Sequence, residues 1–522
     1  MTPCECDATL SFLLWATCLS LHLFSAARVG SRKREQQQHD HRLRIRKYFI
    51  STFEVGVRGF FDASKCLTRP GRNRGAQLSR QLKGATAPAP ERVERADHTS
   101  EAVKVKRAEE AARRGHWHRA VTTLFSEDVH IKPSECKDVK RELVGLHPAA
   151  EKTDVMRQVQ VAKETIIVTS SEVLAAAKKM ARGDAPGASG LTSDVLAQVL
   201  AFEDEIGGNE LQDLVAALVT QMLKNDIPGD VARGMRQIRL VPLAKRRADG
   251  SFKGVRPVAM SETMLKLAAN IALMRHPHHG AFWDYQYGMK RGGVEEAIFK
   301  VQDAVRAGKW VRTFDATNAY NTLRRDSFFR NMETSMDDGM FGLLKAYTNF
   351  VYGGSSTATY EDESGDLHRI EVHTGVRQGD PCGPLLFCLG IQPVLEKVAQ
   401  SLGVGVEVIA YLDDIALIFE DGASAELVKK TTDLLVTEMK AIGLVLRVES
   451  DSKGVEDFRY LGAAITRDVS KTSEALRKHR PLAPVQKFAE TIVPMDRRIS
   501  TELLRVCGVS RGGFVARTHG AA

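Results

Sequence analysis

Apolar residues recur at helical spacing in several stretches after about residue 100, which predicts amphipathic helices there. Two such helical faces consist of Val173, Leu174, Ala177 and Met180, and of Leu211, Leu214, Val215, Leu218 and Met222. Between them, residues 183–187 combine Gly, Asp and Pro, so we expect a loop rather than a continued helix. This part of the chain is therefore predicted to be mainly helical.

Shorter apolar runs further along predict strands. Residues 238–243 and 255–260 form two such runs with a turn at Gly250 between them. Ser261 then stands before an apolar helical pattern, where it is expected to cap the helix. Basic residues lie on or between the two strands, namely Lys245, Arg246, Arg247, Lys253 and Arg256. We therefore expect a basic hairpin that is suited to contact phosphate groups.

Carboxylates stand at the ends of other apolar strands. Asp315 ends the partly apolar stretch 310–314, and the adjacent pair Asp413 and Asp414 is flanked by apolar runs on both sides. Because two aspartates do not lie unpaired in a core, the second segment predicts a hairpin with an acidic tip. Three such carboxylates can bind hard divalent cations that assist phosphoryl transfer. Taken alone, such an aspartate pair is more often an ordinary acidic turn than a catalytic site.

Composition narrows the class of protein. The 522 residues are 43% hydrophobic and 27% charged, which excludes a wholly disordered, collagen-like or multi-span membrane protein. The formal net charge of +9 favours a polyanionic partner only weakly in so long a chain. Residues 31–47 form a basic block, typical of a nucleic-acid-binding arm, a nuclear localisation signal or a solvated tail, and residues 68–98 indicate a linker. The eight cysteines contain no C-x-x-C pair and indicate neither a zinc site nor a disulfide framework.

An apolar run at residues 10–24 has some features of a signal peptide, since Ser25, Ala26 and Ala27 follow it. However, acidic rather than basic residues precede the run, and it is short for a membrane-spanning helix. We therefore expect an intracellular protein, nuclear or cytoplasmic, that is not secreted and needs no membrane.

Three segments resemble, in order and spacing, motifs A, B and C of reverse transcriptases. They are residues 314–320 (FDATNAY), 375–387 (GVRQGDPCGPLLF) and 411–414 (YLDD). The second is most similar to the non-LTR (LINE-like) retrotransposon enzymes. Further segments that match the family are 185–191 (APGASGL), 256–258 (RPV), 286–288 (QYG) and 460–462 (YLG). The resemblance covers about residues 110–515.

The resemblance implies an α+β fold of the right-hand polymerase type. Its expected parts are a low-order basic N-terminal extension and linker (1–100), a helical upstream segment (101–164), fingers (165–300), a palm (301–468) and a partial thumb (469–522). The implied activity is that of an RNA-directed DNA polymerase of a retroelement, with two Mg²⁺ ions, or Mn²⁺, at its centre. The implied partners are an RNA template, a DNA or RNA primer and dNTPs, while the oligomeric state stays open.

The family pattern assigns the catalytic centre to matching positions. Asp315, Asp413 and Asp414 would be the catalytic metal ligands, and the main-chain carbonyl of Ala316 would be a further ligand. Tyr320, five positions after Asp315, would be the aromatic steric gate that excludes a 2′-OH. A tyrosine at this position could instead belong to the core.

The same pattern assigns the nucleotide-binding and primer-binding residues. Gln378 and Gly379 would lie against the incoming nucleotide and the template, where a Cβ on residue 379 would have no room. Arg256 and Lys245 would hold the triphosphate, or else be solvated charges of the hairpin. The predicted primer grip consists of Tyr460, Leu461 and Gly462.

One motif departs from the family. After residues 443–444 the family usually continues x-L-N-x-x-K, with a lysine suggested to protonate the pyrophosphate leaving group. Here Arg447 replaces the asparagine and Ser450 the lysine, although Lys453 could substitute if the loop is longer. This departure leaves open a decayed, non-catalytic RNA-binding remnant, which the intact aspartates argue against.

Another right-hand polymerase, such as an RNA-dependent RNA polymerase, is a further alternative. Tyr320 and the Y-x-D-D form of motif C argue against it. A complete LINE-like element normally carries an endonuclease, and the sequence contains no recognisable one. We therefore expect the chain to be a fragment of a longer element, a truncated gene model or a stand-alone remnant.

Overall fold

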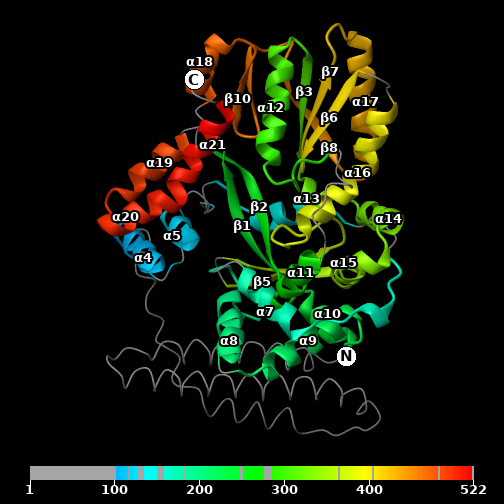
Figure 1. Ribbon diagram of the computed structural model, residues 1–522, viewed down its shortest axis with the longest axis vertical. Coiled ribbons are helices and arrows are strands. Elements are labelled where there is room, and N and C mark those ends of the chain that lie inside the picture. Colours follow the sequence, from blue (N-terminus) through cyan, green and yellow to red (C-terminus); the bar gives the residue numbers. More distant parts are fainter. Residues whose placement is uncertain are drawn as a thin grey trace.

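The computed structural model describes residues 101–519, apart from 114, 116, 126–130, 132–134, 150–157, 181–182, 188, 206, 247–250, 276–284, 363–364, 402–404 and 480–482. The extension expected at residues 1–100 lies outside the described residues. Two four-stranded sheets and one two-stranded sheet are surrounded by helices (Figure 1), which confirms the α+β class. None of the described helices is both long and apolar enough to cross a bilayer.

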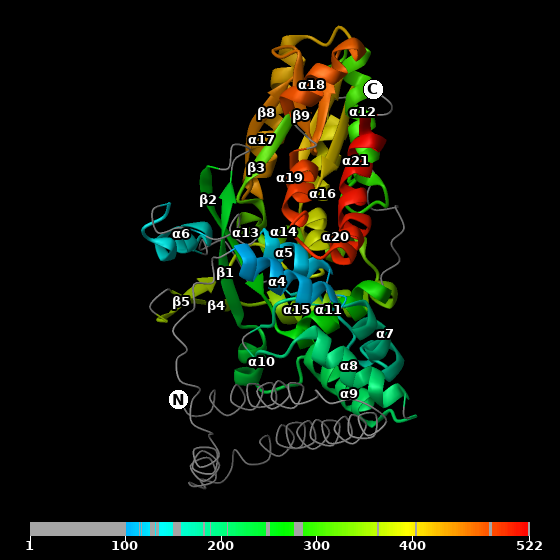
Figure 2. The same ribbon diagram turned by 90° about the vertical axis from the view of Figure 1, so that its left-hand side faces the viewer.

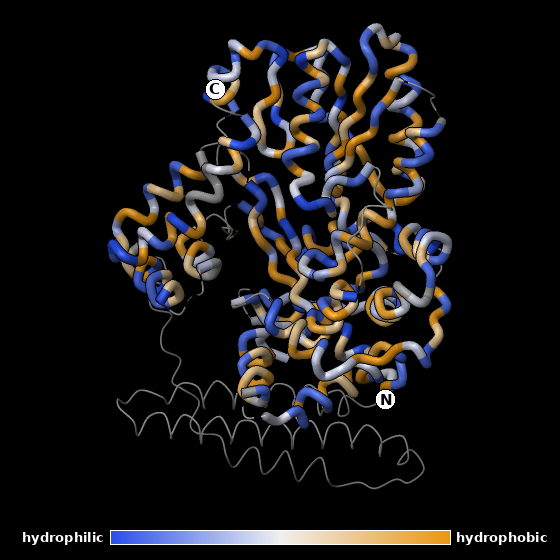
Figure 3. Tube along the Cα trace, in the orientation of Figure 1, coloured by the Kyte–Doolittle hydropathy of each residue, from blue (hydrophilic) through white to orange (hydrophobic). Residues whose placement is uncertain are grey.

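The sheet at the top of Figure 1, called the upper sheet, is antiparallel throughout. In spatial order its strands are β6 (Val406–Tyr411), β7 (Asp414–Phe419), β3 (Trp310–Thr317) and β8 (Val445–Asp451). Along β7, Ile415 and Leu417 join one hydrophobic core, whereas Ala416 and Ile418 join another. Both faces of the strand are thus covered, which explains its uninterrupted apolar run (Figure 3).

Helices and a second hairpin provide these two covers. On one face lie α16 (Gly383–Ser401) and α17 (Ala425–Ala441). On the other lie α12 (Gly293–Arg306) and the two-stranded sheet of β9 (Asp457–Tyr460) and β10 (Ala463–Thr466). At the lower end of the upper sheet in Figure 1, β3 leads into the short helix α13 (Ala319–Thr322).

The second four-stranded sheet, called the lower sheet, contains the predicted basic hairpin. Its order is β2 (Phe252–Met260), β1 (Ile238–Arg246), β4 (Ser356–Glu361) and β5 (Leu367–Val372). β1 pairs with β2 in antiparallel and with β4 in parallel orientation. The helix α6 (Val139–Leu146) covers this sheet through Leu143, which packs in the same core as Ile238.

Helices fill the middle and lower parts of the described molecule in Figures 1 and 2. They are α7 (Ser170–Lys179), α8 (Ser193–Glu205), α9 (Glu210–Leu223), α10 (Gly229–Met235), α11 (Thr263–Arg275), α14 (Arg325–Ser335) and α15 (Asp338–Tyr352). The expectation that Ser261 caps α11 is wrong. That helix begins two residues later, and the buried Ser261 hydroxyl has no hydrogen-bond partner among the described residues. Glu262 occupies the position before the helix, and its carbonyl accepts from the N–H of Lys266 at 3.0 Å.

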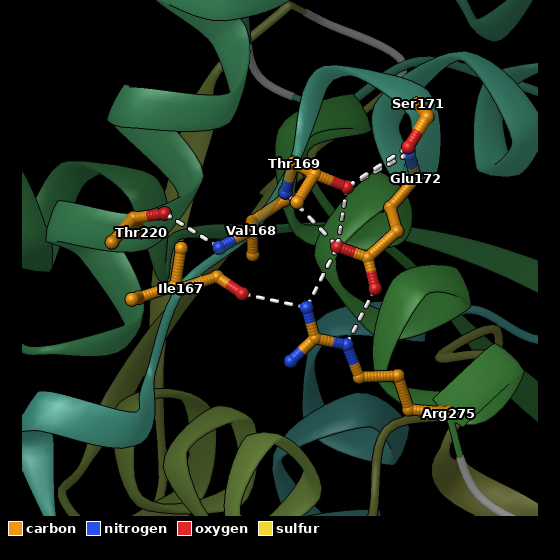
Figure 4. A network of polar contacts seen from close by, with 7 residues as sticks. All are labelled: Ile167, Val168, Thr169, Ser171, Glu172, Thr220 and Arg275. Carbon is orange, nitrogen blue, oxygen red and sulfur yellow. Dashed lines mark hydrogen bonds and ion pairs between the residues drawn. The ribbon is translucent and has the colours of Figure 1, made fainter.

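A polar network ties the start of α7 to the end of α11 (Figure 4). Thr169 and Glu172 form a reciprocal capping box, in which the Thr169 N–H donates to Glu172 Oε2 at 2.9 Å. Arg275, the last residue of α11, donates to the same carboxylate at 2.7 Å and to the Ile167 carbonyl at 2.6 Å. One carboxylate therefore serves both as a cap and as the partner of a distant cation.

The two ends of the described chain meet in a helical lobe, on the left in Figure 1. It contains α4 (Glu101–Arg113), α5 (Trp117–Leu124), α19 (Ala483–Ile492), α20 (Arg497–Leu503) and α21 (Val509–His519), the last preceded by a π-helical turn at Leu504–Gly508. Both views place α4 beside α20. Ala108 and Ala120 share one core with Phe488, Ile499 and Leu503. The remaining helix, α18 (Thr472–His479), packs on β9 and β10.

Candidate active site

The β6–β7 hairpin brings Asp413 and Asp414 beside Asp315. Tyr411 pairs with Asp414, so Leu412 and Asp413 form the tip of the hairpin. The pairing between β3 and β7 ends directly before Asp315 on one strand and directly after Asp414 on the other. The three aspartates therefore gather at one end of the upper sheet, although 98 positions of sequence separate Asp315 from Asp413.

A short segment supports this tip from the side. The Tyr287 N–H donates to the Ala410 carbonyl at 2.7 Å, and the Ala410 N–H donates to the Tyr285 carbonyl at 2.8 Å. Residues 285–287 thus lie parallel to β6 as an additional strand-like segment. A Cβ on Gly288 would lie 3.0 Å from the backbone nitrogen of Leu412, so a glycine lets this segment approach the tip closely.

Burial and mutual repulsion raise the pKa values of the two tip carboxyls. The pKa of Asp414 is raised to about 7, chiefly by burial and then by the charges of Asp413, Glu449 and Asp315. The pKa of Asp413 is also raised, first by burial and then by Asp315. A divalent cation would relieve this repulsion, so the donor set fits hard cations with oxygen ligands. Among the described residues, no group of three or more His, Cys, Asp or Glu side chains has its ligand atoms arranged to hold a metal ion.

Two cations of the β1–β2 hairpin act electrostatically on the acidic tip. Leu243 pairs with Arg256, and Lys245 lies two residues further along, so Lys245 and Arg256 project from the same face of the hairpin. Both cations oppose the raised pKa of Asp413. The charges of both predicted triphosphate ligands therefore act on Asp413, one of the predicted catalytic carboxylates.

Tyr320 lies on α13, directly after β3. Its ring stacks on Phe387 with the centroids 5.1 Å apart and the planes 4° from parallel. Its carbonyl accepts from the Val376 N–H at 2.7 Å, and burial together with the nearby Cys388 and Asp413 raises the pKa of its hydroxyl. Because the side chain is only partly buried, Tyr320 lies at the edge of the core beside the carboxylates rather than within it.

Gln378 and Gly379 lie on the loop before α16 and contact β2. The Ala259 N–H donates to the Gln378 carbonyl at 2.9 Å. Gly379 has a φ of +115°, and a Cβ there would lie 2.7 Å from the Ala259 carbonyl oxygen. The glycine is thus required by the backbone of β2 itself, a reason that the sequence does not reveal.

The predicted primer grip forms the turn between β9 and β10. Leu461 and Gly462 both have positive φ angles, of 46° and 86°. Tyr460 is 3% exposed and packs in the core beneath the upper sheet with Ile409. Burial, followed by the charge of Asp414, raises the pKa of the Tyr460 hydroxyl, so this turn lies close to the acidic tip.

The strand β8 carries two site residues whose positions depend on its register. Arg447 pairs with Asp315 across the sheet. Glu449 is the extra residue where the register shifts, and its carboxylate raises the pKa of Asp414 after burial and Asp413. Sequence reasoning missed Glu449, because no local signal marks a β-bulge here.

Lys453 does not take the place of the missing motif D lysine. Its ammonium lies 4.4 Å from the ring centroid of Trp310, the first residue of β3. Asp315 lies five residues further along that strand, a separation of about 16 Å. The basic residue of β8 that stands beside Asp315 is therefore Arg447.

Comparison with known proteins agrees with this geometry. Residues 245–465 match the family model for reverse transcriptase (RNA-dependent DNA polymerase). The retrotransposable element SLACS 132 kDa protein of Trypanosoma brucei gambiense is 27% identical over 66% of this chain and 29% of its own length. The Pol polyprotein from type-1 retrotransposable element R2 of Popillia japonica is 26% identical over 21% of this chain and 18% of its own. The chain thus spans less than a third of the length of these relatives, and its residues 245–465 are similar to the reverse transcriptase family.

Proposed function

We propose that this chain is an RNA-directed DNA polymerase that extends a primer by attack of its 3′-OH on the α-phosphate of a dNTP, with RNA as the template. One observation carries the proposal: the charges of Lys245 and Arg256, on a hairpin of the lower sheet, act on the carboxyl of Asp413 at the hairpin tip of the upper sheet. Carboxylates beside cations are what metal ions and a nucleoside triphosphate require together. The similarity of residues 245–465 to the reverse transcriptase family supports the same reaction.

The carboxylates are the proposed metal ligands. Asp315, Asp413 and Asp414, with the main-chain carbonyl of Ala316, would hold two Mg²⁺ ions, for which Mn²⁺ could substitute. Their oxygen atoms suit both ions, and the mutual repulsion of the carboxylates favours cation binding. When bound, the ions would neutralise charge on the attacking and leaving oxygens.

The other residues would position the nucleotide. Lys245 and Arg256 would bind the triphosphate, the first as a point charge and the second through a bidentate guanidinium. Tyr320 would lie beneath the sugar, where a 2′-OH would collide with its ring. Gln378 and Gly379 would lie along the base and the template. These residues would contribute to catalysis by positioning the nucleotide, because holding the reactants in a reactive geometry lowers the entropic cost of reaching the transition state.

The primer end would rest on the β9–β10 turn. Leu461 and Gly462 would contact the terminal nucleotide of a DNA or RNA primer near the carboxylates, and Tyr460, whose side chain is buried, would support the turn from the core. The electrostatic influence of Asp414 on the Tyr460 hydroxyl supports this proximity.

Primer extension by the full-length chain tests the proposal. A primed RNA template is incubated with dNTPs or with NTPs, in Mg²⁺ or in Mn²⁺, and Asp413→Asn serves as the control. Incorporation of dNTPs above that control supports the proposal, and incorporation of NTPs in their place would identify an RNA polymerase. If neither substrate is incorporated above the control, the polymerase proposal fails, and the alternative of a non-catalytic remnant is favoured.

A further inference from the structure

A buried carboxylate outside the catalytic centre anchors the loop that carries Gln378 and Gly379. Asp380 is 4% exposed, yet its oxygens accept three hydrogen bonds. The donors are the Tyr347 hydroxyl at 2.8 Å, the Tyr352 hydroxyl at 2.5 Å and the Cys382 N–H at 2.9 Å. Burying a carboxylate costs free energy, and these three hydrogen-bond donors offset part of that cost.

One of these tyrosines bonds both sides of the loop. The Tyr352 hydroxyl donates to Asp380 and accepts from the Arg377 N–H at 3.2 Å. The two bonded positions directly flank Gln378 and Gly379 in sequence. A single phenol oxygen thus fixes the start and the end of the two-residue segment that contacts β2.

Arg377 strengthens the same anchor. Its guanidinium carbon lies 5.7 Å from the Tyr352 ring centroid, and Nη2 donates to the Arg236 carbonyl at 2.9 Å and to Ser356 Oγ at 2.8 Å. The cation therefore balances the charge of Asp380 within a region closed to solvent.

The opposite side of the loop meets the β1–β2 hairpin, where the Ala259 N–H donates to the Gln378 carbonyl. Both tyrosines belong to α15, so the segment is fixed between a buried helix and the strand that also bears Arg256. These contacts therefore fix the position of Gln378 and Gly379 relative to Arg256 on β2.

We propose that Asp380, Tyr347 and Tyr352 are positioning residues that hold Gln378 and Gly379 in the geometry that binds the incoming nucleotide. They touch no substrate and act through the loop. This inference rests on the proposed polymerase function for its kinetic readout, and on the structure alone for its conformational one.

Two matched substitutions separate positioning from packing. Tyr352→Phe and Tyr347→Phe keep the buried rings and remove one hydroxyl each, but only the first also leaves the Arg377 N–H without its acceptor. Tyr360→Phe removes a hydroxyl from another buried tyrosine, on β4 of the lower sheet, and serves as the control.

Two measurements are made on the full-length chain and its variants. Steady-state kinetics give kcat, the KM for dNTP and the KM for primer–template, and amide hydrogen exchange reports on the peptide 375–383. We expect Tyr352→Phe to raise the KM for dNTP about tenfold and Tyr347→Phe about threefold, with the KM for primer–template unchanged. Exchange in peptide 375–383 should accelerate in the same order and stay at the wild-type rate in Tyr360→Phe.

The inference is overturned if exchange in Tyr352→Phe equals that in Tyr360→Phe, or if an active Tyr352→Phe enzyme keeps the wild-type KM for dNTP. If the wild-type chain incorporates no nucleotide, the polymerase proposal fails separately, and the exchange rates still decide whether these residues hold the loop.

Discussion

Glu109 Oε1 accepts a hydrogen bond from the backbone N–H of Asp496 at 2.7 Å, across 387 positions of sequence. Asp496 in turn caps α20, because its Oδ1 accepts from the N–H groups of Arg498 and Ile499. A residue of the first described helix therefore fixes the cap of a helix near the end of the chain. The helices α4 and α5 pack as part of the C-terminal lobe, although they precede all the described strands in sequence.

The first prediction concerns this shared core. Ala108 is fully buried and Ala102 is exposed on the same helix. Ala108→Asp would bury an unpaired charge and should destabilise the lobe by about 3 kcal/mol or more. We expect faster amide exchange in α19 and α20, far away in sequence, and wild-type exchange in Ala102→Asp. Equal exchange in the two variants would contradict the packing described.

The second prediction concerns the acidic tip. Asp413→Asn removes one of the repelling charges, so we expect the midpoint of thermal unfolding, measured with a chelator present, to rise. Nucleotide incorporation should decrease at least about a hundredfold, because a charge that stabilises the transition state is lost. Adding Mg²⁺ should raise the midpoint of the wild type more than that of the variant. A midpoint that falls sharply in the chelator would mean that Asp413 is structural.

The third prediction concerns sugar selection by Tyr320. Tyr320→Phe keeps the ring that stacks on Phe387, whereas Tyr320→Ala removes it. The alanine variant should lose dNTP preference over NTP by at least about tenfold in kcat/KM, and the phenylalanine variant should keep it. Competition assays with paired dNTP and NTP measure this ratio. Unchanged selectivity in Tyr320→Ala would remove the tyrosine from the role of steric gate.

The fourth prediction distinguishes two basic residues of the region that departs from the family. Arg447 pairs with Asp315, whereas Lys453 lies over Trp310 at the far end of β3. Arg447→Ala should lower kcat about tenfold through loss of charge stabilisation, since a guanidinium keeps its proton. Lys453→Ala should leave single-turnover rates unchanged. The opposite ranking would show that the register of β8 differs in the active enzyme.

The fifth prediction concerns pH and the network of Figure 4. Burial tends to raise the pKa of Glu172, but hydrogen bonds from Arg275 and Thr169 outweigh it, so the pKa lies below its ordinary value. Stability from this carboxylate is therefore present above the ordinary glutamate pKa and is lost as the pH falls through the lowered pKa.

Glu172→Gln should accordingly cost about 1 kcal/mol of unfolding free energy near neutral pH and progressively less below about pH 4. The exposed Glu164→Gln on a neighbouring segment is the control and should change little. Denaturant unfolding at several pH values gives both differences. A deficit that stayed constant down to acidic pH would mean that the charge of Glu172 contributes nothing.

Local patterns determined much of this protein. Alternating and continuous apolar runs predicted β1, β2, β6 and β7, because the buried positions of a strand are occupied by apolar residues. The acidic tip followed from the cost of burying aspartates, and the basic hairpin from its charges. These inferences needed only neighbours in sequence. The residue roles assigned by resemblance stay predictions.

Only the tertiary structure decided which distant segments meet. The joining of α4 to α20, the position of Glu449 at a bulge and the exclusion of Lys453 from the site all depend on register and packing. The same holds for Gly379, whose missing Cβ makes room for the carbonyl of Ala259. An apolar face shows that it must be buried, but many partners would bury it equally well. The choice among them is made by the whole fold, through pairings that no local pattern contains.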